Sequence, residues 1–213
     1  MRSWKRRGRS ACRVADRTRH QPWPPADLAS RQPRWRTLLA GSPLHRFHSS
    51  GYGPVYFDRS RSGRLNAPDG GYGVIYTAEQ PTGAFAETFL RAPGRTLLPM
   101  DLIAAKAYAI LSANRDLRLV ELHGPGLAVL GATAEVTSSG LPYDLPQAWS
   151  RAVHDAWPDA DGISYRARHD NDQICFALFD RTESAIQNAV QENSLDADWF
   201  YELMDLYGVG LTS

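Results

Sequence analysis

The sequence has few cysteines and no long apolar run, and both shortages limit what the protein can be. Its 213 residues include two cysteines, Cys12 and Cys175, which lie far apart and form no CxxC pair. A disulfide scaffold or a cysteine-rich zinc site is therefore excluded, and we expect a protein of the reducing cytoplasm. No apolar run approaches the roughly 20 residues that span a bilayer. We therefore expect no membrane partner, and the basic N-terminus lacks the apolar segment of a secretory signal.

Common catalytic and metal-binding motifs are absent as well. The sequence "HRFH" spaces His45 and His48 by three residues and lacks the glutamate of a helical zinc pair. The sequence "DADG" at 159–162 fails as a calcium loop, because Trp157 and Arg168 occupy positions that need carboxylates. The dinucleotide fingerprint, the P-loop and the nucleophile elbow do not occur.

Positive charge is unevenly distributed along the chain. Residues 1–36 hold eleven Lys or Arg and two acidic residues, a local charge of +9, which leaves −8 for the remainder. Blocks of like charge are typical of disordered tails, and "QPWPPADLASRQP" shows no periodicity. We therefore expect a basic, disordered extension over residues 1–42 and one domain over residues 43–213. Contact between the extension and nucleic acid is the alternative.

Strands and helices alternate irregularly in the remaining chain. "LHRFH" (44–48) and "GVIYTA" (73–78) have the composition of strands, and a capping box at Thr77 and Gln80 with Pro81 predicts a helix to about residue 90. "LRLVEL", "DGISYRA" and "QICFALFD" predict further strands, and "LPQAWSRAVHDAW" and "DADWFYELMDLYG" predict helices. Because no regular βαβ pattern appears, the sequence favours an α+β domain over a doubly wound parallel sheet.

Four polar residues near the junctions of these elements could form a nucleotide site: Arg46, Arg64, Tyr76 and Glu87. An arginine offers a charged fork for phosphate oxygens, and an aromatic ring offers a face on which a base or a nicotinamide can stack. A carboxylate can stabilise the oxocarbenium ion that forms when a glycosidic bond breaks. Each residue also has an ordinary interpretation as a surface charge or a core-rim aromatic, and spacing alone does not decide between them.

Longer stretches of the sequence carry a family resemblance. "LHRFH", "GRLNAPDGGYGVIYTAEQPTGAFAE", "DGISYRARHDNDQICFALFDR" and "LMDLYGVGL" resemble, in this order, the RES domain over about residues 44–211. RES domains are the toxin half of Xre–RES toxin–antitoxin systems. The resemblance implies a compact α+β fold similar to ADP-ribosyltransferases, and degradation of NAD at the nicotinamide–ribose bond by hydrolysis or phosphorolysis. ADP-ribosyl transfer to a macromolecular target, or a catalytically weak RES-like binding module, are the alternatives.

The resemblance also implies residue roles and partners. Glu87, Arg46 and Tyr76 would be catalytic, and NAD would be held by Arg64, Arg46, Tyr76, Arg166 and Arg168. NAD would be consumed as a substrate, so no cofactor and no metal are expected. An Xre-type helix-turn-helix antitoxin would be the partner and would provide the only contact with nucleic acid, and a homodimer is left open.

One position departs from the family pattern. The serine of the family lies in a "YRSR"-like motif, whereas this chain reads "YRAR", with Ala167 in its place. Ser164 is a poor substitute, because an offset of three residues puts it on the opposite face of a strand. The loss of one hydroxyl could cost roughly 0.5–3 kcal/mol of phosphate binding, so the sequence predicts a weakened enzyme.

Overall fold

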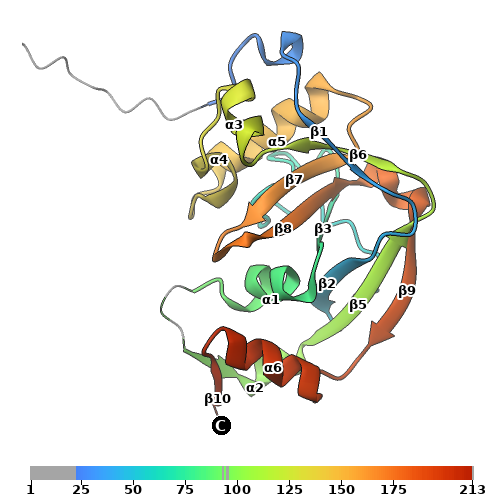
Figure 1. Ribbon diagram of the computed structural model, residues 1–213, viewed down its shortest axis with the longest axis vertical. Coiled ribbons are helices and arrows are strands. Elements are labelled where there is room, and N and C mark those ends of the chain that lie inside the picture. The colour runs from blue at the N-terminus through green and yellow to red at the C-terminus, as the bar shows by residue number, and fades with distance from the viewer. Residues whose placement is uncertain (1–22, 93, 95, 213) are drawn as a thin grey trace, which may run out of the picture.

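The computed structural model describes residues 23–92, 94 and 96–212, and within them ten strands form two sheets (Figure 1). The strands are β1 (Trp35–Leu38), β2 (Leu44–Ser49), β3 (Val74–Ala78), β4 (Leu97–Pro99), β5 (Lys106–Ala113), β6 (Leu117–Glu121), β7 (Gly162–Ala167), β8 (Asp170–Phe179), β9 (Ile186–Glu192) and β10 (Gly210–Thr212). The large sheet has the order β1-β6-β7-β8-β3-β2-β5-β9 and is antiparallel except between β6 and β7. Strands β4 and β10 form a small parallel pair.

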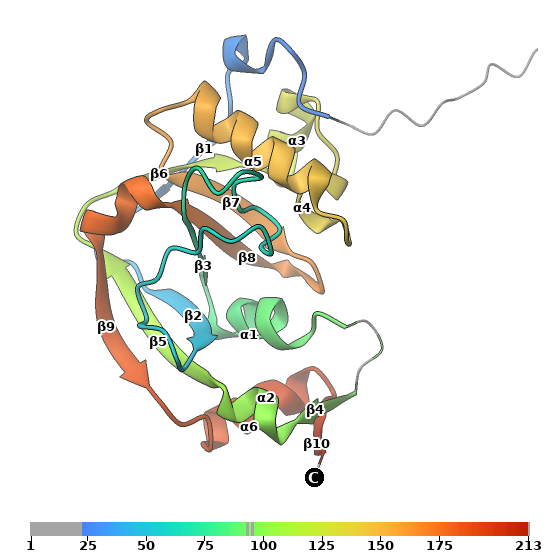
Figure 2. The ribbon, with the colours of Figure 1, turned by 180° about the vertical axis from the view of Figure 1, so that it is seen from behind.

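Helices lie at both ends of the large sheet, as the two opposite views show (Figures 1 and 2). They are α1 (Pro81–Phe89), α2 (Met100–Ala104), α3 (Pro125–Leu130), α4 (Glu135–Ser138), α5 (Asp144–Ala156) and α6 (Asp198–Leu206), with 3-10 turns η1 (Leu28–Ser30) and η2 (Asp180–Ala185). Helices α3, α4 and α5 gather near β7, and α2 and α6 lie at the other end, beyond α1. This mixture confirms the predicted α+β class. In the described part of the chain, no helix is both long and apolar enough to span a membrane.

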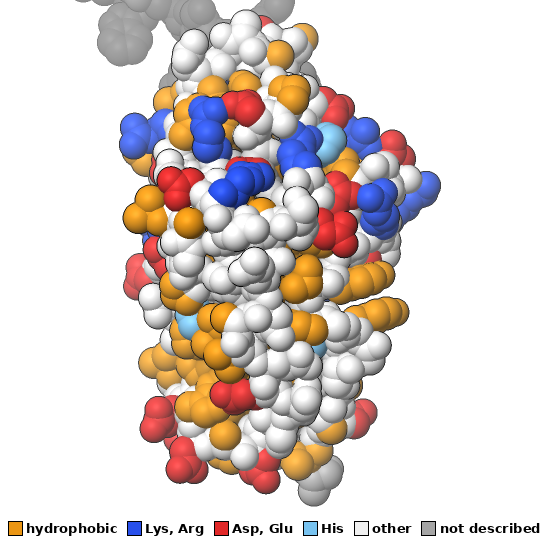
Figure 3. Space-filling model, turned by 90° about the vertical axis from the view of Figure 1, so that its right-hand side faces the viewer, with side chains coloured by type: hydrophobic (Ala, Val, Ile, Leu, Met, Phe, Trp, Pro, Cys, Tyr) orange, Lys and Arg blue, Asp and Glu red, His pale blue; other side chains and the backbone are white. Residues whose placement is uncertain are grey.

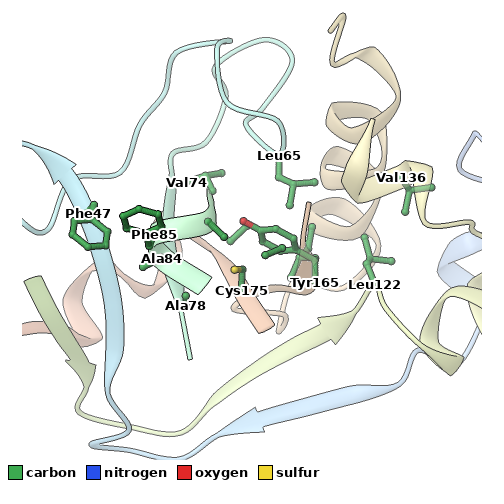
Figure 4. Packing of buried hydrophobic residues seen from close by; sticks show 14 of the residues in the cluster. Phe47, Leu65, Val74, Ala78, Ala84, Phe85, Leu122, Val136, Tyr165 and Cys175 are labelled. Atoms are coloured by element: carbon green, nitrogen blue, oxygen red, sulfur yellow. The ribbon is translucent and has the colours of Figure 1, made fainter. Parts of the chain in front are cut away.

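Two apolar clusters stabilise the domain, one on each face of the large sheet. On the helical face, Phe47, Phe85, Phe89 and Phe200 pack ring against ring, with centroids 5.0–6.3 Å apart. Figure 4 shows this cluster extending from Phe47 and Phe85 to Tyr165. The other cluster consists mainly of strand residues, such as Leu111 and Phe176. Each fully buried large side chain contributes about 1.5–3 kcal/mol, so the two clusters are a major source of the stability of the domain.

The domain begins before the expected boundary at residue 43. Strand β1 pairs with β6 from Trp35↔Val120 to Leu38↔Leu117, and Leu28 is buried in the helical-face cluster. Basic residues on both sides obscured this short strand in the sequence. The structure therefore places residues 23–42 in the domain, while residues 1–22 of the predicted extension lie outside the described residues.

Charge is also uneven over the surface. On the face shown in Figure 3, Lys and Arg side chains gather at the upper end, whereas the charged side chains of the lower end are acidic. Helix α6 lies at the lower end of the molecule in Figure 1, and four acidic residues of and around it are exposed: Asp196, Asp198, Glu202 and Asp205.

The large sheet is incompletely paired in its middle, and this feature positions the site. Strand β2 pairs with β5 over six positions and β3 pairs with β8 over five, but β2 and β3 are paired only at His45↔Ala78. Beyond this pair the two strands separate. Residues 46–49 and 74–77 therefore line the two sides of a gap, and the segment 50–73 connects them.

Candidate active site

A cavity of about 470 Å³ lies where β2 and β3 separate. Its walls come from β2, β3, the side of α1, the segment 49–64 and the turn between β7 and β8. This volume is typical of small-ligand sites, which range over roughly 300–1,000 Å³. The cavity brings together five of the six predicted site residues: Arg46, Arg64, Tyr76, Glu87 and Arg168.

The carboxylate of Glu87 is held from three directions. Arg64 Nη2 donates to Oε2 at 2.5 Å, and the Tyr165 hydroxyl donates to the same oxygen at 3.2 Å. The backbone N–H of Arg168 donates to Oε1 at 2.8 Å. Helix α1 supplies the carboxylate, and its three donors come from the segment before β3, from β7 and from the β7–β8 turn. A carboxylate held in this way has one orientation, with its charge at the cavity wall.

Arg64 is committed to this ion pair. The Arg64 and Glu87 side chains are 10% and 18% exposed, so their attraction is only weakly screened by solvent. Burial by itself lowers the pKa of Arg64, but Glu87 and the surrounding tyrosines outweigh it and the pKa is raised. The Arg64 guanidinium also lies over the ring of Tyr165, 5.6 Å from its centroid. Arg64 is therefore placed to orient Glu87, and its role in binding NAD stays a prediction.

Tyr76 fixes the turn that carries Arg64. Its hydroxyl donates to Asn66 Oδ1 at 2.8 Å and accepts from the backbone N–H of Leu65 at 2.8 Å, while its ring lines the cavity. Burial raises the pKa of Tyr76, which therefore stays neutral and donates at physiological pH. A Cβ at Gly63 would lie 2.1 Å from Asn66 Oδ1, so only glycine fits before Arg64 in this turn.

Arg46 is a half-buried cation with no ion-pair partner among the described residues. Its Nε and Nη1 atoms are buried and form no hydrogen bond, and burial lowers its pKa to about 10, so it stays charged at neutral pH. Of seven such unpaired buried side-chain atoms in the described part of the chain, six belong to residues that line the cavity: Arg46, His48, Arg64, Thr77 and His169. Unpaired buried polar atoms are costly, so their concentration here indicates a site for a polar ligand.

Comparison with known proteins identifies the family of this chain. The family model of the RES domain matches residues 13–200. The chain belongs to the RES domain family. A search of curated protein sequences finds no match. Among solved structures, the fold is similar to the toxin in the "M.tuberculosis MbcT-MbcA toxin-antitoxin complex" with a TM-score of 0.62 and 15% identity, over 79% of this chain and 92% of that chain.

Arg166 and Arg168, the two arginines on either side of position 167 that were predicted to bind NAD, lie in different surroundings. Arg166 is exposed and lies outside the cavity, where its Nη1 donates to the backbone oxygen of Asn171 at 2.5 Å. Arg168 lines the cavity. Ala167 is fully buried in the helical-face cluster, and the Ser164 hydroxyl bonds to His123 Nε2 at 3.0 Å, outside the cavity. Ser164 therefore does not replace the serine of the family.

Several cavity residues were missed by the sequence reasoning. Tyr165 lies two residues before Ala167 in "YRAR", so strand alternation could have placed it on the same face. Tyr52 and Tyr56 stack at the edge of the cavity with centroids 4.6 Å apart and are 56% and 41% exposed. No short-range pattern marks this pair. Within the described residues, no group of three His, Cys, Asp or Glu side chains could hold a metal.

The predicted start of α1 at Pro81 is confirmed, but the predicted capping box is wrong. Pro81 is the first residue of the helix, as predicted. The capping box does not form, because Thr77 belongs to β3 and its hydroxyl has no partner, and Gln80 makes no side-chain capping bond. Proline alone, with its fixed φ, therefore marks the helix start.

Proposed function

We propose that this RES domain cleaves the nicotinamide–ribose bond of NAD, with water or phosphate as the acceptor. One observation carries the proposal: the fixed carboxylate of Glu87 and the unpaired cation of Arg46 line the same cavity. NAD has the complementary charges, since its pyrophosphate is anionic and its ribose becomes cationic as the glycosidic bond breaks.

The reaction would proceed through charge stabilisation. The C1′–N bond breaks, its electron pair stays with nicotinamide, which becomes neutral, and the positive charge moves to the ribose. Glu87, oriented by Arg64 and Tyr165, stabilises this charge in the transition state. The ring of Tyr76 forms a wall beside the nicotinamide or ribose, and Arg46 attracts the phosphates. Water or phosphate then attacks C1′, and no metal or redox cofactor takes part.

The biological role we propose is that of a toxin under the control of an antitoxin. Loss of NAD would stop metabolism in the cytoplasm, so an enzyme of this kind needs a partner that inhibits it. Support comes from the family and from the similar fold of MbcT, whose structure is that of a toxin–antitoxin complex. By the family resemblance the partner would be an Xre-type helix-turn-helix protein, and DNA would be bound only through it.

Mass spectrometry of NAD incubated with purified protein, with and without phosphate, tests this function. We expect nicotinamide together with ADP-ribose or its 1″-phosphate. Glu87→Gln should lower the turnover by about 10²–10³-fold, the usual effect of removing one electrostatic contact to a transition state, and keep NAD binding by calorimetry. Glu183→Gln is the matched control, because Glu183 is exposed and does not line the cavity. A near-wild-type rate for Glu87→Gln would remove this carboxylate from the mechanism, and modified protein or nucleic acid would identify ADP-ribosyl transfer instead.

A further inference from the structure

The cavity contains two more cations that the proposed mechanism does not use. Arg91 follows the end of α1, and Lys106 is the first residue of β5, and both line the cavity together with Arg46. Among the residues that the structure describes, no carboxylate forms an ion pair with any of these three side chains. Glu87, the acidic residue nearest in the chain to Arg91, is already paired with Arg64.

The sheet places Lys106 and Arg46 on neighbouring strands. In the β2–β5 pair, Lys106 lies opposite Ser49 and Ala109 lies opposite Arg46. All three cations line the same cavity, and in keeping with this the pKa of Lys106 is lowered by burial first and then by the positive charges of Arg91 and Arg46. Like charges in a half-buried site repel one another, and an anion bound among them would offset this repulsion.

Hydrogen-bonding capacity also remains free. Arg91 Nε donates to the backbone oxygen of Glu87 at 3.0 Å. The two Nη groups of Arg91 form no hydrogen bond to any of the residues that the structure describes. Arg46 has two buried nitrogen atoms without acceptors, and Lys106 has no protein acceptor in the same part of the chain. The pKa of the neighbouring His48 is lowered overall, first by burial and then by the nearby cations, which together outweigh the two backbone carbonyls that raise it. His48 therefore adds no positive charge at neutral pH.

We propose that Arg46, Arg91 and Lys106 form a subsite for phosphoryl oxygens, in which Lys106 selects phosphate-bearing ligands over plain nucleosides. This inference rests on the proposed function, in that NAD is the expected phosphate-bearing ligand. The anion is the pyrophosphate of the dinucleotide or the free phosphate that attacks the ribose, and both present the same oxygens. A lysine ammonium suits either, since it binds phosphate as a point charge and needs no bidentate geometry.

The chain offers an internal control for a test of Lys106. It has only two lysines, Lys5 and Lys106, so Lys5→Gln makes the same change in net charge and lies outside the described residues. Calorimetry with inorganic pyrophosphate and with ADP should show binding to the wild type that is at least about tenfold weaker for Lys106→Gln. Lys5→Gln should bind as the wild type does, and Lys106→Arg should retain most of the affinity.

This binding test decides the proposal without reference to catalysis. Equal affinity of Lys106→Gln and the wild type, or no binding of pyrophosphate and ADP to the wild type at millimolar concentration, would overturn it. Melting temperatures show whether each variant is folded, and Arg91→Gln replaces Lys106→Gln if the latter is not. A wild type that binds ADP through Lys106 but does not cleave NAD would refute the proposed function and leave the subsite standing.

Steady-state kinetics identify the source of the anion. If the subsite holds the pyrophosphate of NAD, Lys106→Gln should raise KM for NAD by about tenfold and leave KM for nicotinamide riboside unchanged, in buffer without phosphate. If it holds the attacking phosphate, the variant should lose the acceleration by added phosphate with both substrates. A variant that shows neither change, while the wild type is active, would contradict the proposal.

Discussion

Arg46→Met should stabilise the folded protein while it weakens anion binding. Arg46 is a cation in the wall of the cavity, and its Nε and Nη1 atoms are buried without hydrogen-bond partners. In the absence of ligand, the folded state therefore contains a poorly solvated charge that the unfolded state exposes to water. Methionine keeps most of the aliphatic stem and removes the charge, so the folded state should gain from the substitution.

The size of the effect follows from the pKa of Arg46. Burial lowers this pKa from its ordinary value of 12.5 to about 10. Each unit corresponds to 1.36 kcal/mol, so the charged form is destabilised by roughly 3 kcal/mol in the folded protein at any pH well below 10. This cost fades as the pH rises from about 10 towards 12.5, where the unfolded arginine also loses its proton. With some packing lost, we expect a net gain of about 2 kcal/mol, or a melting temperature higher by about 4–8 °C.

Thermal unfolding at pH 7.5, with and without pyrophosphate, is the assay. A ligand at a hundred times its Kd stabilises a protein by about 2.7 kcal/mol, so saturated wild type and ligand-free Arg46→Met should melt at similar temperatures. The variant should show a smaller shift with pyrophosphate than the wild type, because only Arg91 and Lys106 remain in the proposed subsite. Arg61→Met, at an exposed arginine, should change the melting temperature by less than about 2 °C. A less stable Arg46→Met protein would refute the reasoning, because it would mean that the folded domain needs this charge.

Two further predictions concern the edge of the sheet and position 167. A chain that starts at Gly41 loses β1 and the buried side chains of Leu28 and Leu38, so its free energy of unfolding should fall by at least about 3–6 kcal/mol. A chain that starts at Trp23 is the control and should have an unchanged melting temperature. Equal stability of the two chains would show that the domain does not need β1. Ala167 is fully buried in the helical-face cluster and does not line the cavity, so Ala167→Ser should change NAD cleavage, measured as nicotinamide release, by less than about twofold. A rise of about tenfold would show instead that the added hydroxyl reaches the substrate.

Local patterns in the sequence predicted the elements that carry the site. Alternation in "LHRFH" and the glycine before "VIYTA" predicted β2 and β3, and Pro81 predicted the start of α1. These patterns depend on neighbouring residues, so a single sequence contains them. The resemblance to the RES domain added Arg46, Arg64, Tyr76 and Glu87 as site residues, and all four line one cavity, while their roles remain a prediction.

Features that depend on distant contacts could not be predicted in this way. Arg64 and Glu87 are 23 residues apart, and nothing in their spacing indicates that they form an ion pair. Lys106 lies in an alanine-rich segment that fits a helix as well as a strand, and only its pairing with β2 brings it to the cavity. Strand β1 was missed because its four residues lie in a basic stretch, and its burial depends on β6, which begins at Leu117.

The separation of β2 from β3 explains why Arg46, which we propose binds the anion, also lowers the stability of the folded protein. If the pairing at His45↔Ala78 continued along both strands, the backbones would close the gap, and Arg46 would lie on the surface of a continuous sheet. The gap leaves its side chain in the wall of the cavity, with Nε and Nη1 buried and no ion pair to a carboxylate among the described residues. Segment 50–73 maintains this arrangement through the bonds of Tyr76 to Leu65 and Asn66, which hold the turn against β3. The apolar clusters on the two faces of the sheet therefore offset the cost of gathering positive charge in the cavity, and a bound anion would lower that cost.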